Sequence, residues 1–490
     1  VEIVLGKVMG AALSGAVLIA APSAKANGRF PASNRIVLSP TDPNVIIVRA
    51  TYGILPSEDH GKTWAFLCED ALGVSPMAIV DPVLELTAAN ALVSGLPFGG
   101  LSVSSDTGCT WSCAGDALAG EAIADIAVRP DAPHSVVALT STVVSSDAGP
   151  SWHSQVFQSV DDGMHWAPLG NALDPGVLVT TIDVAPSDPH RLYVSATRGY
   201  GPMRTGALFV SMDDGATWTE HPAPLDTVFE EGLFIGGVDP SDADRVYVRT
   251  SGQPSRLLVT LDAGQSFQIP VTFVAQMRGF ALSPDGSKIF VGGSVDGLLV
   301  GDRATLSFAR RSSIVMGGDG GPIDVHIGCL AARGSELWAC ADEPSGFTVG
   351  VSTDDGVTFA PRLHLNGVGA PIRCCASSPA SLACGADSGG AYCSGEPFAQ
   401  LCANLDCAGP SPPPDAMGPD CAAANAGLPD AGLPADASLP ADAGPPGSKS
   451  THGSPACGCR FSRDREEASI AVLSMAFAAA MFRRRRRSLP

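Results

Sequence analysis

Short apolar runs return along this chain about every 50 residues, separated by turns rich in proline, aspartate and glycine. Val45-Ile46-Ile47-Val48 follows a proline-containing turn, as does Arg191-Leu192-Tyr193-Val194 in a later unit. Another run, Ala207-Leu208-Phe209-Val210, leads into a glycine turn. Runs of this length bounded by turn residues are typical of buried β-strands. Because no amphipathic helical stretch of useful length occurs in 27–406, the pattern predicts an all-β body.

An eight-residue pattern, Ser-x-Asp-x-Gly-x-Thr-Trp, lies between the third and fourth run of each unit. Near-complete copies occupy 57–64, 104–111, 159–166 and 211–218, and looser copies occupy 260–267 and 352–359. Successive aspartates are 47, 55, 52, 49 and 92 residues apart, so the last gap indicates one degenerate copy, at 301–308. A match at 145–152 lies too close to the next copy for a separate unit and is interpreted as a loop insertion.

A final unit at 372–401, with Phe398 in place of tryptophan, brings the count to eight. Four short antiparallel strands at a period near 50 make one propeller blade. The predicted fold is therefore an all-β, seven- or eight-bladed β-propeller of four-stranded antiparallel blades, with a disordered stalk and a short C-terminal apolar helix.

Each residue of the repeated pattern has an expected mechanical role. The aspartate accepts hydrogen bonds from turn amides, the glycine allows a positive φ, and the aromatic ring is buried between neighbouring blades. The predicted turn residues are Asp59, Gly61, Trp64, Asp106, Gly108, Trp111, Asp161, Gly163, Trp166, Asp213, Gly215, Trp218, Asp262, Gly264, Phe267, Asp354, Gly356 and Phe359.

These turns resemble the Asp-box, the repeat of bacterial neuraminidase-type proteins and of the sortilin and photosystem-assembly propellers. The resemblance covers most of 34–400. It implies a propeller with the turns on its outer circumference, away from an axial pocket. It leaves the activity open, because catalytic and non-catalytic propellers share the repeat.

The resemblance raises the possibility of an enzyme. Sialidases use a tyrosine nucleophile with a glutamate partner, but Tyr193 and Tyr247 fall inside strand patterns and Tyr200 has no glutamate placed beside it. Xyloglucan-hydrolysing propellers use two carboxylates on facing blades, and the abundant acids of this chain select no pair. Neither a metal-ligand cluster nor a cofactor motif is present in the sequence, so no catalytic residue, metal or cofactor is predicted.

Composition and charge limit the class of partner. The 490 residues carry a net charge of −20, and an arginine run at 483–487 makes the rest more acidic still. An acidic body disfavours nucleic acid and anionic lipid surfaces as partners.

Fourteen cysteines favour an oxidising compartment. Facing positions across two predicted hairpins suggest the pairs Cys329–Cys340 and Cys375–Cys384. Cys109–Cys113 and Cys393–Cys402 are further candidates, and buried free thiols remain the alternative.

Both ends carry targeting features. Residues 1–26 have a basic residue, a small apolar run and an Ala-x-Ala site, as secretory signals do. The propeller is assigned to 27–406, and 407–456 is a linker rich in proline, alanine and aspartate that forms no core.

The segment 457–490 combines Cys457-Gly458-Cys459, an apolar stretch of about 15 residues and the arginine run. It resembles the myxobacterial C-terminal sorting tail. That resemblance implies a sorting protease at the membrane, with Cys457 or Cys459 as the processing site; a plain tail anchor is the alternative.

The function predicted from sequence is a non-catalytic binding or scaffold module for a glycan, peptide or protein. The predicted protein is an exported, cell-surface or secreted monomer that meets the membrane only through its tail. Loops at 198–204 and 317–322 are candidate ligand contacts. The alternatives are an extracellular glycoside hydrolase and a shell component without a specific ligand.

Overall fold

The computed structural model describes residues 32–72, 81–96, 99–114, 116–146, 149–199, 201–311, 314–316, 322–374, 378–384 and 409–410. The predicted signal peptide and the sorting tail lie outside these residues, as do Cys375, Cys393, Cys402, Cys457 and Cys459. All but two residues of the predicted linker also lie outside them. Within the described ranges, no helix is both long and apolar enough to cross a membrane.

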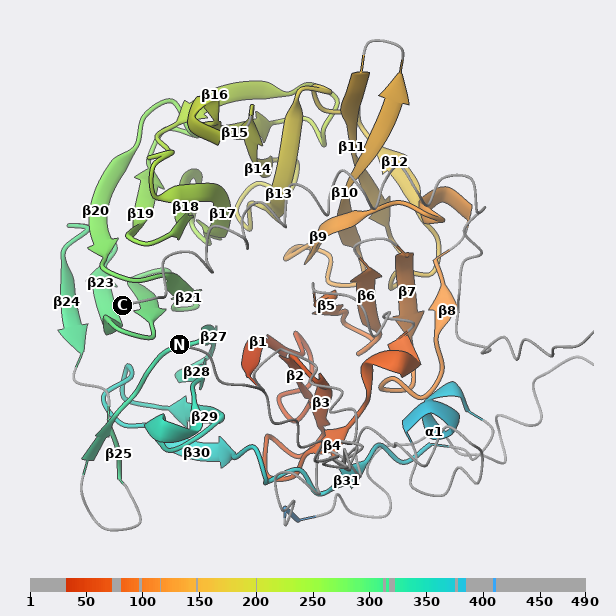
Figure 1. Cartoon of the computed structure of the whole chain (residues 1–490), viewed down its shortest axis with the longest axis vertical. Coiled ribbons are helices and arrows are strands. Elements are labelled where there is room, and N and C mark those ends of the chain that lie inside the picture. Colours follow the sequence, from red (N-terminus) through yellow and green to blue (C-terminus); the bar gives the residue numbers. More distant parts are fainter. Residues whose placement is uncertain are drawn as a thin grey trace, which may run out of the picture. The chain divides into compact units, whose positions relative to one another are not determined.

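Seven blades form a ring, and each blade is an antiparallel meander whose first strand lies innermost (Figure 1). Blade 1 contains β1 (Ser33–Leu38), β2 (Ile46–Ala50), β3 (Gly53–Ser57) and β4 (Ala65–Phe66). Blade 2 contains β5 (Val83–Leu86), β6 (Leu92–Leu96), β7 (Gly100–Ser104) and β8 (Ser112–Cys113). Blade 3 contains β9 (Ile123–Val128), β10 (Val136–Ser146), β11 (Gly149–Ser159) and β12 (Ala167–Leu169).

The ring continues with four more meanders of the same order. Blade 4 contains β13 (Val177–Val184), β14 (Leu192–Arg198), β15 (Thr205–Ser211) and β16 (Thr219–Ala223). Blade 5 contains β17 (Glu230–Asp239), β18 (Asp242–Gly252), β19 (Ser255–Thr260) and β20 (Gln268–Phe273). Blade 6 contains β21 (Met277–Leu282), β22 (Lys288–Gly293), β23 (Gly297–Asp302) and β24 (Phe308–Arg311). Blade 7 contains β27 (Cys329–Arg333), β28 (Glu336–Cys340), β29 (Val349–Ser352) and β30 (Ala360–Leu363).

The middle strands of the blades explain the apolar runs of the sequence. All five residues of β3, β6 and β7 are buried, because a middle strand is covered on both faces by the neighbouring sheets. The predicted insertion at 145–152 lies at the tip of the long β10–β11 hairpin, where Val143 pairs with Trp152. A short hairpin of β25 (Ile314–Met316) and β26 (Pro322–Asp324) separates blades 6 and 7.

The described residues of the eighth unit predicted at 372–401, which are 372–374 and 378–384, do not form a blade. In its described part the chain forms no strand; it makes the short helix α1 (Pro379–Cys384), close to the 3-10 turn η1 (Glu69–Leu72). Just before it, β31 (Ala370–Pro371) pairs in parallel with β4, at the outer edge of blade 1. The described residues of this unit lie against blade 1 instead of forming a new sheet. We call 369–384 the strap, of which 375–377 lie outside the described residues.

Disulfides fasten the strap to the first two blades. Cys384 pairs with Cys68 beside blade 1, and Cys374 pairs with Cys109 in the pattern turn of blade 2. The predicted pairs Cys375–Cys384 and Cys109–Cys113 are therefore wrong. Both predicted pairs join neighbours in sequence, whereas the observed bonds join residues 316 and 265 positions apart. Cys329 and Cys340 are joined across the β27–β28 hairpin, where they lie opposite each other.

The pattern turns connect the third and fourth strands, and their aspartates are bound inside the turn. In blade 4, Asp213 accepts hydrogen bonds from the Thr217 amide at 2.8 Å, the Thr217 hydroxyl at 2.7 Å and the Ser211 hydroxyl at 2.8 Å. These hydrogen bonds lower the pKa of Asp213. The Gly215 amide donates to Ser211 Oγ at 2.7 Å, and its φ of 80° is one that a glycine adopts without strain.

Each pattern turn also reaches the preceding blade. The indole of Trp64 is 1% exposed and donates to the carbonyl oxygen of Arg362 in blade 7 at 2.9 Å. The indole of Trp218 donates to the Asn171 carbonyl oxygen beyond blade 3 at 3.0 Å. The turns therefore join neighbouring blades as well as neighbouring strands.

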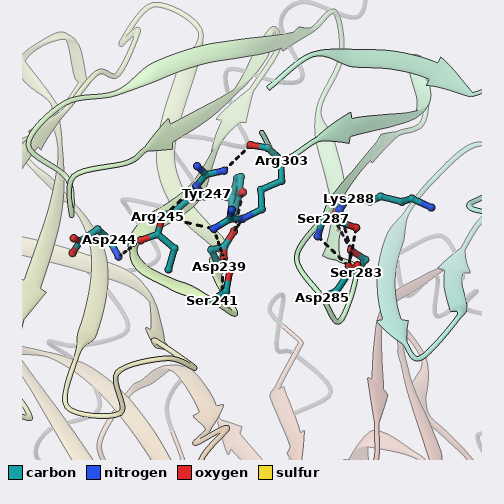
Figure 2. A network of polar contacts seen from close by, with 11 residues as sticks. Asp239, Ser241, Asp244, Arg245, Tyr247, Ser283, Asp285, Ser287, Lys288 and Arg303 are labelled. Carbon is teal, nitrogen blue, oxygen red and sulfur yellow. Dashed lines mark hydrogen bonds and ion pairs between the residues drawn. The ribbon is translucent and has the colours of Figure 1, made fainter. Parts of the chain in front are cut away.

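Blade 6 has a different turn, in which Asp302 accepts hydrogen bonds from Thr305, and it adds an ion pair to the neighbouring blade. In the degenerate copy at 301–308, Arg303 stands where the other copies have aspartate. Figure 2 shows its guanidinium reaching Asp239 of blade 5, with Nε at 2.5 Å from Oδ2 and Nη2 at 3.0 Å from Oδ1. The Asp239 side chain is 0% exposed, and Ser241 and Tyr247 also donate to it. Burial raises the pKa of Asp239, but the bonds from Arg303 and Ser241 bring the net shift below its usual value.

We expect Arg303→Ala to lower the free energy of unfolding by about 3–5 kcal/mol, since it leaves the buried charge of Asp239 without its counter-ion. Asp239→Asn in the same background should recover part of this loss, because it removes the charge. The matched control is Arg278→Ala at an exposed position of β21, expected to change stability by less than ~0.5 kcal/mol. Urea unfolding followed by tryptophan fluorescence measures all three; equal losses for Arg303→Ala and the control would contradict the assignment.

Candidate functional site

The ring has two chemically different ends. We call the end with the pattern turns and the proline turns between first and second strands the turn end. We call the opposite end, where second strands lead into third strands and each blade leads into the next, the loop end. All eighteen predicted turn residues belong to the strand 3–4 connections of the turn end, in blades 1–5 and 7. The structure gives them a scaffold role and does not bring them together into one site.

Four charged side chains on the innermost strands of blades 1–4 form a cluster that we call the axial cluster: Arg35, Glu85, Asp125 and Asp183. Arg35 of β1 forms an ion pair and a hydrogen bond with Glu85 of β5. Their side chains are 33% and 20% exposed, so both lie in restricted contact with water. The strands that carry the cluster, β1, β5, β9 and β13, are the innermost strands of four consecutive blades (Figure 1), so the cluster crosses blade boundaries.

The carboxyl groups of Asp125 and Asp183 have raised pKa values, so they stay protonated to a higher pH than ordinary aspartates do. Burial raises the pKa of Asp125 to about 6, against a partly compensating attraction from Arg35. Burial also raises the pKa of Asp183 to about 7, and the negative charge of Asp125 adds to that rise. Burial raises the pKa of Glu85 too, with Arg35 opposing the shift.

Backbone amides hold both aspartates in place. The Ile182 amide of blade 4 donates to Asp125 Oδ2 of blade 3 at 3.1 Å. The Val184 amide donates to Asp183 Oδ1 at 2.8 Å. The Asp125 carboxylate therefore links the inner strands of blades 3 and 4, whereas the Asp183 carboxylate is held by the next residue of its own strand.

Two further arginines surround the cluster. Burial lowers the pKa of Arg49 and of Arg249 to about 10, while the charge of Asp125 opposes both shifts. Arg49 donates to Asn34 Oδ1 at 2.7 Å and to the Pro82 carbonyl oxygen at 2.7 Å. Three carboxyl groups thus lie near three guanidinium groups, an arrangement that can bind a polar ligand or exchange a proton near neutral pH.

Sequence reasoning missed the axial cluster because no motif marks it. Its members interrupt otherwise apolar first strands, as in Ile123-Ala124-Asp125-Ile126 and Thr181-Ile182-Asp183-Val184. The sequence does place a charged residue at a predicted core position in several successive units. That pattern could have indicated the axial cluster.

The loop end exposes large apolar side chains. Met203 is 83% exposed between β14 and β15, and Val228 is 75% exposed between blades 4 and 5. Phe229, next to Val228, is also exposed, as are Val274 between blades 5 and 6 and Val295 between β22 and β23. The candidate loop at 198–204 belongs to this end; Tyr200 within it and the candidate residues 317–321 lie outside the described residues.

The tyrosines weighed as nucleophiles are part of the core. Tyr193 and Tyr247 are each 0% exposed. The Tyr193 hydroxyl donates to the Ala243 carbonyl oxygen at 2.6 Å, and burial raises its pKa to about 12. Among the residues that the structure describes, no group of three or more histidine, cysteine, aspartate or glutamate side chains is arranged to hold a metal ion.

No family model matches the chain, and no curated protein matches it. Among solved structures it is similar to the GH74 enzyme of Niastella koreensis, with 14% identity and a TM-score of 0.37 over 68% of this chain and 72% of that one. It is similar to the GH74 xyloglucanase of Xanthomonas campestris, with 15% identity and a TM-score of 0.21 over 67% and 68%. It is also similar to YCF48 bound to D1 peptide, with 12% identity and a TM-score of 0.39 over 63% and 88%. At these identities and TM-scores the likenesses carry no inference about activity.

Proposed function

We propose that this chain is an exported cell-surface β-propeller that binds a protein or glycan through its loop end without catalysing a reaction. Export is supported by the secretory features of 1–26, the sorting-type features of 457–490 and the disulfides, which persist in oxidising compartments.

The observation that carries the binding role is the exposure of large apolar side chains on successive loop-end connections. Met203, Val228 and Val274 are each at least three-quarters exposed. Exposed apolar groups gathered on one face of a soluble protein mark surfaces that meet a partner. The turn end also exposes apolar residues, such as Val160 (70%) and Met212 (61%), but none of those that the structure describes there is three-quarters exposed.

The axial carboxylates support a structural or ligand-lining role. Asp125 and Asp183 are bound by backbone amides of the inner strands, and Glu85 is bound by Arg35. A glycoside hydrolase instead needs an acid and a base on opposite sides of a sugar, roughly 5–9.5 Å apart.

A second candidate function is an extracellular glycoside hydrolase. It is favoured by the pKa of Asp183, about 7, and that of Asp125, about 6, since an acid catalyst near neutral pH needs such a value. In this role Asp183 would donate the proton and Asp125 or Glu85 would act as base.

One experiment on the mature chain distinguishes the binding function from the hydrolase function. Immobilised polysaccharides and peptides serve as probes. We expect retention of a probe without release of reducing sugar. Combined Met203→Ser, Val228→Ser and Val274→Ser should weaken retention by at least about tenfold. The matched control, Val160→Ser with Met212→Ser at the turn end, should leave it unchanged. Release of reducing sugar that disappears in Asp183→Asn would establish the hydrolase instead.

The raised pKa of Asp183 makes a separate prediction about stability. An unfolded aspartate titrates near pH 3.9, so between about pH 4 and 7 the folded chain binds more protons than the unfolded chain. The free energy of unfolding therefore falls as the pH rises through this window. Asp183→Asn removes that titration and keeps the Oδ1 acceptor for Val184. We expect the variant to be more stable than wild type at pH 8 by about 1–3 kcal/mol, and the difference to shrink at pH 5.

Urea unfolding at pH 5, 6, 7 and 8 measures this difference. Asp285→Asn is the control, because hydrogen bonds from Ser283 and Ser287 lower the pKa of Asp285 to about 2. A group with a lowered pKa gives stability that is lost only in acid, so its variant should differ from wild type by a constant amount from pH 5 to 8. A constant difference for Asp183→Asn as well would contradict the buried titration.

A further inference from the structure

The exposed apolar side chains of the loop end belong to connections that follow one another across blades 4 to 6. Four connections supply them: β14–β15, the link from blade 4 to blade 5, the link from blade 5 to blade 6, and β22–β23. We call these side chains the loop-end ridge: Met203, Val228, Phe229, Val274 and Val295.

Two hydrogen bonds join the β14–β15 connection to the link between blades 4 and 5. The Thr227 hydroxyl donates to the Pro202 carbonyl oxygen at 3.3 Å. Arg204 Nη1 donates to the Glu231 carbonyl oxygen at 2.8 Å. Because Pro202 and Arg204 flank Met203, the chain at Met203 lies beside that link.

The β18–β19 hairpin carries the surface on to blade 6. A Cβ at Gly252 would approach the Phe229 carbonyl oxygen to 2.0 Å, so this hairpin lies against the link between blades 4 and 5. From the same hairpin, Ser255 Oγ donates to the Ala275 carbonyl oxygen at 3.2 Å. The Ala275 amide in turn donates to Asp296 Oδ2 of blade 6 at 3.2 Å. The four connections therefore follow one another in contact.

Carboxylates outnumber cations along this surface. Four carboxylates and two guanidinium groups belong to the segments that carry it, which are 199–204, 224–231, 252–256, 274–277 and 294–297. One guanidinium, that of Arg256, is bound to the buried carboxylate of Glu230 at 2.6 Å. Within the described part of the chain, no cation forms an ion pair with the other three carboxylates. We call these three the acidic rim: Asp226, Glu231 and Asp296.

The charge of the rim disfavours the chain's own segments as occupants of the ridge. The linker 407–456 has five aspartates and one lysine, and a second copy of the chain would bring a further net charge of −20. Like charges repel, so neither matches an acidic rim. The proposed processing at Cys457 or Cys459 removes the arginine run at 483–487 from the mature chain. The matching occupant is therefore an external partner that carries positive charge.

The side chains of the ridge favour a polypeptide over a sugar. Four of the five are aliphatic or thioether groups, and Phe229 alone offers an aromatic ring. Methionine is enriched at surfaces that bind proteins, because its flexible thioether adapts to the side chains of a partner.

Building on the proposed loop-end function, we infer that the loop-end ridge binds an amphipathic polypeptide segment that combines apolar side chains with lysine or arginine. The apolar side chains of the segment cover the ridge, and its cations lie against the acidic rim. Exposed ion pairs each contribute little affinity, but they orient a partner and exclude partners of the wrong charge. The apolar contact therefore supplies most of the affinity, and the rim selects a basic partner.

The probe is a peptide with leucine and lysine at helical spacing, titrated into the mature chain by isothermal calorimetry. The same peptide with glutamate in place of lysine should bind at least about tenfold more weakly, because the rim repels it. The peptide with serine in place of leucine should also bind at least about tenfold more weakly, because it cannot cover the ridge.

Variants of the chain locate the binding surface. Combined Met203→Ser, Val228→Ser and Val274→Ser should weaken binding of the leucine–lysine peptide at least about tenfold. Asp226→Asn and Glu231→Gln should each weaken it by about two- to fivefold, the range of an exposed ion pair.

Asp42→Asn is the matched control for Asp226→Asn. Each aspartate accepts a hydrogen bond from the amide two residues further on, at 2.9 Å for Asp42 and 3.1 Å for Asp226. Asp42 lies at the turn end, so its variant should leave binding unchanged. Thermal unfolding confirms that each variant is folded.

Equal affinity for the lysine and glutamate peptides, no binding of the lysine peptide, or an equal effect of Asp226→Asn and Asp42→Asn would each overturn the inference. A dimer of the mature chain that the serine variants dissociate would identify a second copy as the occupant and would overturn it as well. Retention of a glycan or of the glutamate peptide through the ridge would leave the proposed loop-end function standing while this inference fails.

Discussion

Each blade of this protein buries both faces of its sheet, so the contact between neighbouring blades is the interaction on which the structure depends. A middle strand such as β6, fully buried, is stable only between two adjoining sheets. A row of such sheets would leave an apolar face bare at each end. The ring removes those faces, provided that the first blade meets the last.

Two sets of contacts close the ring. Blade 1 packs against blade 7 near the centre, and the strap covers blade 1 at the outer edge. Inside, β1 packs against β27 and β28 of blade 7. Outside, Trp64 of blade 1 donates to blade 7, and β31 then adds to the edge of blade 1. Blade 1 therefore keeps its own four strands from one continuous stretch of chain, while the C-terminal segment passes outside it to blade 2.

The sequence predicted much of this because local chemistry repeats. A turn such as 211–218 needs only its own eight residues, so the period of the pattern was enough to predict four-stranded blades. Contacts between residues far apart in the sequence leave no repeated local pattern. Cys384 bonds to Cys68 because the strap crosses blade 1, and nothing near either cysteine indicates that partner. Arg35 and Glu85 likewise meet only after the ring has formed, so no local motif predicts their contact. Residues 372–384 of the strap were assigned to a predicted eighth unit at 372–401, because apolar residues that cover a blade resemble those that build one.

The disulfide between Cys109 and Cys374 has a topological consequence for the effect of a break in the main chain. It encloses blades 3 to 7 in one covalent loop, and the bond from Cys68 to Cys384 encloses that loop in turn. One break of the main chain anywhere between residues 110 and 373 would leave a single covalent molecule. A nicked blade would then remain beside its neighbours, at a high effective concentration for docking back into the ring.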